Sequence, residues 1–256
     1  MNLDELFDNV HKVPKIPKVV QDLIKCFESD DGSLDEIAQK VAMDQMIAAR
    51  VLRLANTAKF GGARQIASVD DAVVRLGFDA VRTLVIASGL SGAVGEIAGL
   101  DIRQYWTETF QVATLCKDYA RQAGLQPETA FTCAMLHNVG HVILVQYQAD
   151  TGLSDADLPS TADIGAELAK RWQFPDVMVT AITQQATPLA YDEVNAYACL
   201  IAFSKLLMSV DASNDDAVND ACTSELGQQL KIDPVKVNNN LLDLKAAGEE
   251  FALSIA

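Results

Sequence analysis

Two of the chain's three histidines lie in one apolar stretch, residues 130–146, which is the best candidate for chemistry. His137 and His141 are four residues apart, so a continuous helix would carry both on one face and could bind a metal ion. Asn138 follows the first histidine directly. A carboxylate at this position can bridge two divalent ions, whereas a neutral amide offers a single carbonyl oxygen. We therefore favour a hydrogen-bonded histidine without a metal over a metal site.

A second candidate is the segment 37–54, whose spacing of small and apolar residues resembles a DNA-reading helix-turn-helix that lacks the usual turn glycine. Four side chains in or just after this segment could form a local basic face: Arg50, Arg53, Lys59 and Arg64. The alternative, which we favour, is that their stems pack on the core while their charged ends are solvated or paired with acidic residues. The formal net charge of −15 opposes the approach of nucleic acid.

The composition predicts a folded protein without a membrane segment. The 256 residues are 50% hydrophobic, which is enough for one large domain or two small ones. We find no apolar run long enough to span a membrane and no signal peptide in the acidic N-terminal residues. The five cysteines are scattered without a C-x-x-C pair, so we expect them to be reduced and the protein to be cytoplasmic. With three histidines in all, nucleophilic catalysis has few possible bases.

Helical periodicity and capping signals predict an all-α protein. The first part of the chain is expected to contain a helix from about Pro17, a capping box at Ser33–Glu36, a helix that breaks near Met43–Asp44 and ends at Ala55, and helices over 68–77 and 78–90. The glycine-rich stretch 88–100 predicts a hinge. The later helices are expected at 101–122, 127–136, 137–146 (separate or as a continuation), 161–172, 175–185 and 191–210, with two more near the C-terminus.

The string 51–61, VLRLANTAKFG, is the most specific part of a wider resemblance. Further matching residues are Ile37-Ala38, Asp44, Leu76-Gly77, Tyr105–Thr109, Leu136–Gly140, Ile164–Leu168 and Phe174-Pro175. Together they resemble the HDOD domain, the HD-related output domain of bacterial signalling proteins and a degenerate branch of the HD phosphohydrolase superfamily. One departure is Gln45, where the family usually has proline.

The resemblance implies an all-helical domain of two lobes over residues 14–210. The N-terminal lobe would span about 14–95 and the HD-like lobe about 100–210. Domain-size reasoning leaves residues 211–256 as a C-terminal helical extension. The resemblance also implies a regulatory rather than a catalytic role.

The resemblance further locates a degenerate metal site. The metal ligands of catalytic HD proteins correspond to the following positions of this chain. The first histidine corresponds to Glu108, the His-Asp doublet to His137-Asn138, later histidines to the region of Gln184-Gln185, and a final aspartate to the region of Phe203. His137 alone keeps its ligand type, so we expect no catalytic residue and no metal cofactor. If an ion were held, its ligands would be His137, Asn138 and Glu108.

Two functions follow from these alternatives. The first, which we favour, is a non-catalytic bacterial signalling module that binds a protein partner through Arg50, Arg53, Lys59 and Arg64, or a small ligand in the degenerate cleft. The second is a metal-dependent phosphohydrolase with atypical ligands and a divalent ion as cofactor. We expect no membrane partner. Binding of DNA through residues 37–54 is a third and weaker alternative, which a steep salt dependence would reveal.

Overall fold

The structure is a computed structural model that describes residues 2–10, 13–25, 39, 41–42, 44–56, 65–95, 97–152 and 158–255. Every regular element in these residues is helical, so the predicted all-α fold is confirmed. The predicted capping box at Ser33–Glu36 lies outside them. No helix of the described ranges is both long and apolar enough to cross a membrane.

Four of the described helices build the N-terminal lobe: α2 (Lys18–Lys25), α4 (Gln45–Ala55), α5 (Val69–Leu76) and α6 (Phe78–Ala93). Two of them begin at a side-chain cap: Ser68, where a helix start was predicted, and Asp44, where a break in a helix was predicted. Oδ1 of Asp44 accepts a hydrogen bond from the N–H of Ile47 at 3.1 Å, and the Ser68 hydroxyl accepts one from the N–H of Asp71 at 3.0 Å. Helix α5 ends at Gly77, whose φ of 81° favours glycine. Helices α4 and α5 both pack against α6.

The predicted hinge at 88–100 is wrong in its first half, because α6 continues to Ala93. Two glycines in that half allow close approach of other helices. A Cβ at Gly89 would collide with the side chain of Val20, and a Cβ at Gly92 would collide with the guanidinium of Arg50. Glycine is therefore needed at both positions for α2 and α4 to rest on α6.

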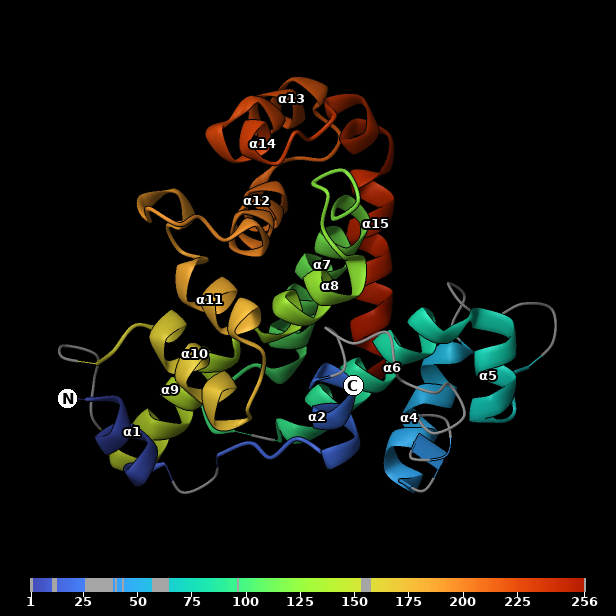
Figure 1. Ribbon diagram of the computed structural model, residues 1–256, viewed down its shortest axis with the longest axis vertical. Helices are drawn as coiled ribbons and strands as arrows, with labels where there is room; N and C mark the ends of the chain where they lie inside the picture. The colour runs from blue at the N-terminus through green and yellow to red at the C-terminus, as the bar shows by residue number, and fades with distance from the viewer. Residues whose placement is uncertain are drawn as a thin grey trace.

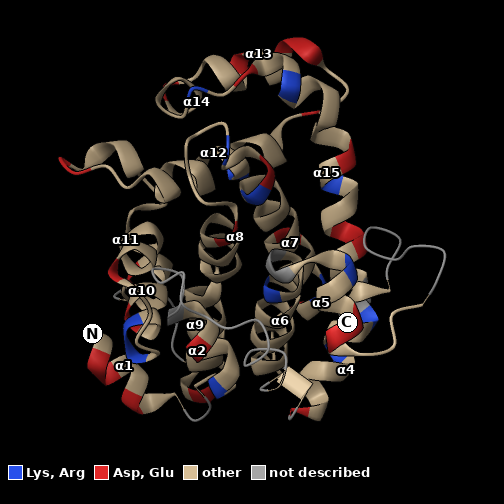
Figure 2. Ribbon diagram, turned by 45° about the vertical axis from the view of Figure 1, so that its right-hand side comes forward, with Lys and Arg blue, Asp and Glu red and all other residues tan. Residues whose placement is uncertain are grey.

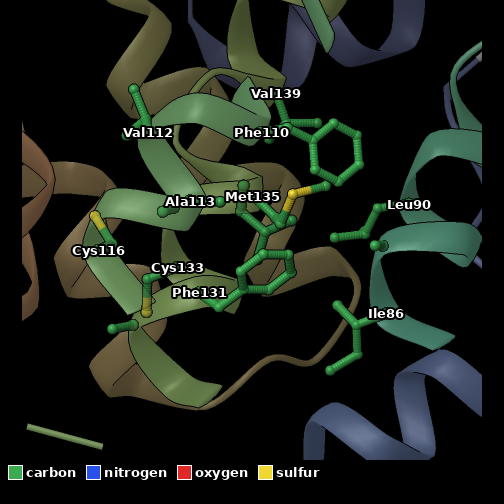
Figure 3. Close-up of a cluster of buried hydrophobic side chains, with 14 of the residues drawn as sticks. Ile86, Leu90, Phe110, Val112, Ala113, Cys116, Phe131, Cys133, Met135 and Val139 are labelled. Carbon is green, nitrogen blue, oxygen red and sulfur yellow. The ribbon is translucent and has the colours of Figure 1, made fainter. Parts of the chain in front are cut away.

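The HD-like lobe consists of α7 (Ile102–Tyr119), α8 (Pro127–Leu136), α9 (Val139–Thr151), α10 (Thr161–Arg171), α11 (Asp176–Gln184), the 3-10 helix η2 (Pro188–Ala190) and α12 (Ala196–Ser209). Helix α8 is buried along nearly all of its length. Figure 3 shows its side chains Phe131 and Met135 facing Ile86 and Leu90 of α6. The two lobes therefore share one continuous apolar core.

The N-terminal helix α1 (Leu3–Asn9) packs against α9 of the HD-like lobe (Figure 1). The Arg171 guanidinium lies 4.4 Å from the ring centre of Phe7 and 2.8 Å from a carboxylate oxygen of Asp4. Nε1 of Trp172 donates a hydrogen bond to the carbonyl oxygen of Pro14 at 3.3 Å. The chain thus crosses the HD-like lobe before it enters the N-terminal lobe.

The C-terminal residues form α13 (Asp215–Thr223), α14 (Glu225–Gln229) and α15 (Pro234–Ile255). Figure 1 shows α15 running back alongside α7. The ring centres of Phe251 and Phe110 are 4.8 Å apart, and the hydroxyl of Tyr119 donates to Oδ1 of Asn240 at 2.9 Å. The extension therefore contributes to the core of the HD-like lobe, while the domain boundary at residue 210 stays a prediction.

Candidate functional site

The stretch that carries two histidines forms two helices rather than one. Helix α8 ends at Leu136 with His137 as its C-cap, and α9 begins at Val139 after the N-cap Asn138. A shared helix face for His137 and His141, which a continuous helix would have provided, is therefore excluded. His141 lies in the first turn of α9 and lines a different part of the site.

The imidazole of His137 is buried and held in one tautomer. Its Nδ1 lies 2.6 Å from the carbonyl oxygen of Ala134, and since a carbonyl only accepts, Nδ1 donates. Nε2 keeps its lone pair and has no hydrogen-bond partner in the described part of the chain. Burial lowers the pKa of His137 to about 4. The hydrogen bond to Ala134 raises the pKa and the charge of Lys205 lowers it, but both effects are smaller than that of burial. The ring is therefore neutral at pH 7.

His137 and Asn138 line a pocket of about 440 Å³ between α7 and α12. The other lining residues are Glu108 and Val112 of α7, and Lys205 and Met208 of α12. A neighbouring pocket of about 390 Å³ shares Glu108 and Asn138 and reaches His141 and the start of α7. Because the two pockets share these residues, we treat them as one groove. We call it the relic groove and define it by Glu108, His137, Asn138, His141 and Lys205.

Three of the five predicted degenerate positions meet in the relic groove: Glu108, His137 and Asn138. Gln185 lies behind it, where its Nε2 donates to the backbone carbonyl oxygen of His137 at 2.6 Å. The buried Oε1 of Gln185 has no partner among the residues that the structure describes. Phe203 is fully buried in the apolar core and does not line the groove.

Lys205 is a groove residue that the sequence analysis missed. It is the one charged residue of α12, whose sequence is AYACLIAFSKLLMS, and a single charge in an apolar helix is the signal that could have identified it. Partial desolvation lowers the pKa of its ammonium group, which stays exposed to solvent. Within the described ranges Lys205 has no hydrogen bond and no ion pair. Across the groove, Oε1 of Glu108 accepts a hydrogen bond from Nε2 of Gln104 at 2.8 Å.

The donors of the relic groove do not fit a divalent metal ion. Among the described side chains, no three of His, Cys, Asp or Glu are placed to hold one. The groove would supply one carboxylate from Glu108, one imidazole from His137 and one neutral amide from Asn138, which is too few anionic oxygens for a hard cation. The ammonium of Lys205 would repel the ion. A two-metal centre also needs a bridging carboxylate, which Asn138 does not provide.

The four basic residues expected to contact a partner are only partly described. Arg50 is half-buried, and its Nη1 donates to the carbonyl oxygen of Ser88 at 3.2 Å, so this side chain ties α4 to α6. Arg53 is exposed on α4. Lys59 and Arg64 lie outside the described residues. Figure 2 shows the lysines and arginines spread over several helices rather than gathered on one.

Comparisons with known proteins relate the chain to one family. The model of the HDOD domain matches residues 13–154. A putative phosphohydrolase from Shewanella amazonensis SB2B, known from its crystal structure, is 30% identical, with 98% of both chains covered and a TM-score of 0.81. The structure of a putative signal transduction protein from Marinobacter aquaeolei VT8 is 22% identical, with 96% of this chain and 60% of that chain covered and a TM-score of 0.66.

One curated relative is longer than this chain. An uncharacterized protein of Treponema pallidum (strain Nichols) is 25% identical over an alignment of 222 residues, and the match covers 78% of this chain and 42% of that protein. The chain therefore spans less than half the length of this relative.

Proposed function

Because the chain belongs to the HDOD family, we propose that it is a non-catalytic regulatory module that acts by binding a protein partner. The observation that carries this proposal is the presence of Lys205 in the relic groove, beside His137 and Asn138. An HD-type hydrolase needs a divalent cation at this position to activate water. In this chain a lysine ammonium brings positive charge to the same groove, and the carboxylate that would bridge two ions is replaced by an amide.

A metal-dependent phosphohydrolase is the second candidate, and one observation favours it. His137 has the hydrogen bond typical of a metal-binding histidine, since Nδ1 donates to a backbone carbonyl and Nε2 stays free. The name of the Shewanella relative points the same way. This candidate lacks a general base, however, because Glu108 would have to serve as a ligand. We therefore place it second.

Metal content and hydrolysis distinguish the two candidates. The full chain without a metal-binding tag is analysed for metals before and after incubation with manganese, iron or zinc, and is then assayed with a chromogenic phosphodiester. We expect no stoichiometric metal and no turnover, because the groove supplies one carboxylate and one imidazole. Near-stoichiometric metal, together with turnover that His137→Ala abolishes, would overturn the regulatory proposal.

The proposed partner contacts are those of the basic face on and after α4. Arg53 is its exposed residue within the described ranges, whereas Arg50 is engaged with Ser88. In our proposal Arg53, Lys59 and Arg64 contact the partner directly, while Arg50 holds α4 in place. We also place the module in the bacterial cytoplasm, where its cysteines would remain reduced.

A further inference from the structure

We infer that the relic groove binds a small ligand that carries an anionic group, phosphate or carboxylate, next to an O–H or N–H donor. Lys205 and Asn138 hold the anionic group, Nε2 of His137 accepts the hydrogen of the donor, and the carboxylate of Glu108 can accept from a second donor. This inference rests on the proposed function, because it requires a groove that holds no metal.

The first support is the state of Lys205. Lys205 is the one charged residue of α12, and its side chain lines the groove while it stays accessible to solvent. No carboxylate lies within ion-pairing distance of its ammonium in the described structure, and Glu108 lines the opposite wall. Partial desolvation lowers the pKa of this ammonium, so its charged form gains from a nearby anion. An anion bound in the groove would supply that counter-ion.

The second support is the start of α9, which lies at the same groove. Its N-cap, Asn138, lines the groove and makes no capping hydrogen bond with its side chain. The free N–H groups at the start of a helix and the positive end of the helix dipole favour a nearby anion. The amide of Asn138 is itself free to donate a hydrogen bond. Lys205 and Asn138 thus present a positive charge and a donor to one space, close to the positive end of the α9 dipole.

The third support defines the rest of the ligand. His137 is 8% exposed, and its unpartnered Nε2 is an acceptor because Nδ1 carries the proton. Glu108 adds a second acceptor on the opposite wall. A ligand without a hydrogen to donate would leave the buried Nε2 of His137 unpaired and would place its anionic oxygens near the carboxylate of Glu108, which selects against it. Dihydrogen phosphate, which carries two O–H groups, can donate to both acceptors, and a monohydrogen phosphate or a singly protonated phosphomonoester can donate to His137, whereas sulfate can donate to neither.

The size of the groove agrees with a small molecule. The pocket beside Lys205 has a volume of about 440 Å³, which is within the range of small-molecule sites, roughly 300–1,000 Å³. The adjoining pocket, lined by Asp101, Gln104, Tyr105 and His141, gives space for the part of the ligand beyond its anionic group.

Inorganic phosphate and sulfate are the probes that test this inference. The full chain is treated with EDTA, transferred to a phosphate-free buffer at pH 7 and titrated with each anion by calorimetry. We expect saturable binding of phosphate at one site and binding of sulfate that is about tenfold weaker or more, because sulfate has no hydrogen for His137 and Glu108. Absence of saturable phosphate binding, or equal affinities for the two anions, would overturn the inference.

Two groove variants have opposite expected effects. Lys205→Met removes the cation and should weaken phosphate binding about tenfold or more. Glu108→Gln removes a like charge, so it should strengthen sulfate binding and reduce the preference for phosphate. The matched control is Lys236→Met, which changes an exposed lysine of α15 outside the groove lining and should leave both affinities unchanged. Circular dichroism confirms that each variant is folded.

The outcomes for the inference and for the proposed function are separate. If phosphate fails to bind and the chain also lacks metal and turnover, the regulatory proposal stands and the anion site falls. Equal loss of phosphate binding in Lys205→Met and Lys236→Met would overturn the site at the groove. Phosphate that binds only after manganese has been added would overturn both, because the metal would then be the anion's partner.

Discussion

A buried neutral histidine makes the stability of this protein depend on pH. Burial lowers the pKa of His137 from 6.5 to about 4, and the charge of Lys205 adds to the effect. Between these two values the unfolded chain binds more protons than the folded one, so the full stability is present above pH 6.5 and decreases as the pH falls towards 4. From this shift we expect His137 to contribute a loss of roughly 3 kcal/mol in the free energy of unfolding. Denaturant unfolding at several pH values measures it.

The contribution of His137 is isolated by a comparison of variants. The other titratable groups are common to the wild type and to His137→Gln, so the difference between these two proteins reports on the histidine. His141→Gln is the control for the loss of a histidine from the groove, because this half-buried ring has no side-chain hydrogen bond with a described residue. An unchanged pH dependence in His137→Gln would contradict the assignment.

Single residues of the groove were predictable only where the resemblance had a motif. Glu108, His137 and Asn138 were expected at one site, because each lies in a string that matches the family, and they line one pocket. On α12 no such string exists: the resemblance gave Phe203 as the position of the final aspartate, whereas the residues of α12 that line the groove include Lys205 and not Phe203. Successive side chains turn by about 100° around a helix, so an offset of two residues moves a side chain to nearly the opposite face. The packing of α12 against α7 decides which face of α12 points to the groove, and this contact cannot be read from the sequence.

At the scale of elements, one glycine controls how α9 packs on α10. A Cβ at Gly140 would collide with the carbonyl oxygen of Thr161 and lie 2.7 Å from the backbone nitrogen of Gly165. These neighbours are backbone atoms, which cannot move aside as a flexible side chain would. We therefore expect Gly140→Ala to lower the free energy of unfolding by about 1–3 kcal/mol or more, as overpacking does. Urea denaturation of the full chain measures the change.

The matched control for this prediction is Gly95→Ala. Gly95 is exposed after the end of α6, and a Cβ there would meet no atom within 4 Å. The stability of this variant should stay within about 0.5 kcal/mol of the wild type. Equal stabilities for Gly140→Ala and Gly95→Ala would show that α9 and α10 do not approach each other as closely as the structure indicates.

A helix end could be predicted from the sequence where the residues that fix it lie within one turn of it. Caps were found because a cap acts within one turn, as at Ser68, where the hydroxyl binds the N–H of Asp71. The glycines of α6 were misread because glycine permits both a flexible hinge and a close helix contact. Which of the two applies is decided by Val20 and Arg50, which are distant in sequence.

At the scale of the whole molecule, the fold class was predictable and the role of the C-terminal extension was not. Helical periodicity determines the all-α class locally, residue by residue. The contact between α15 and α7 joins Lys245 to Gln111, whose Nε2 donates to the lysine carbonyl oxygen at 3.2 Å. Length-based domain reasoning cannot detect such contacts across more than a hundred residues. The extension therefore looked like an addition although it packs as part of the HD-like lobe.

This arrangement predicts that α15 stabilises the whole protein. Phe251 is 5% exposed, and its ring packs edge-on against Phe110 at 4.8 Å. Because Phe251→Ala leaves a cavity between α15 and α7, we expect it to lower the free energy of unfolding by about 3–5 kcal/mol. We also expect a single transition to remain, since the lobes share one apolar core. Denaturant unfolding followed by both fluorescence and circular dichroism measures the stability and the number of transitions.

The neighbouring Leu253 supplies the control, because it lies on the same helix and is 48% exposed. Leu253→Ala should change the stability by no more than about 0.5 kcal/mol, as surface substitutions usually do. An extension that folded independently would behave differently, because Phe251→Ala would then leave the main transition in place and split off a second, smaller one. That result would restore residue 210 as a true domain boundary and would detach α15 from the core around Phe110.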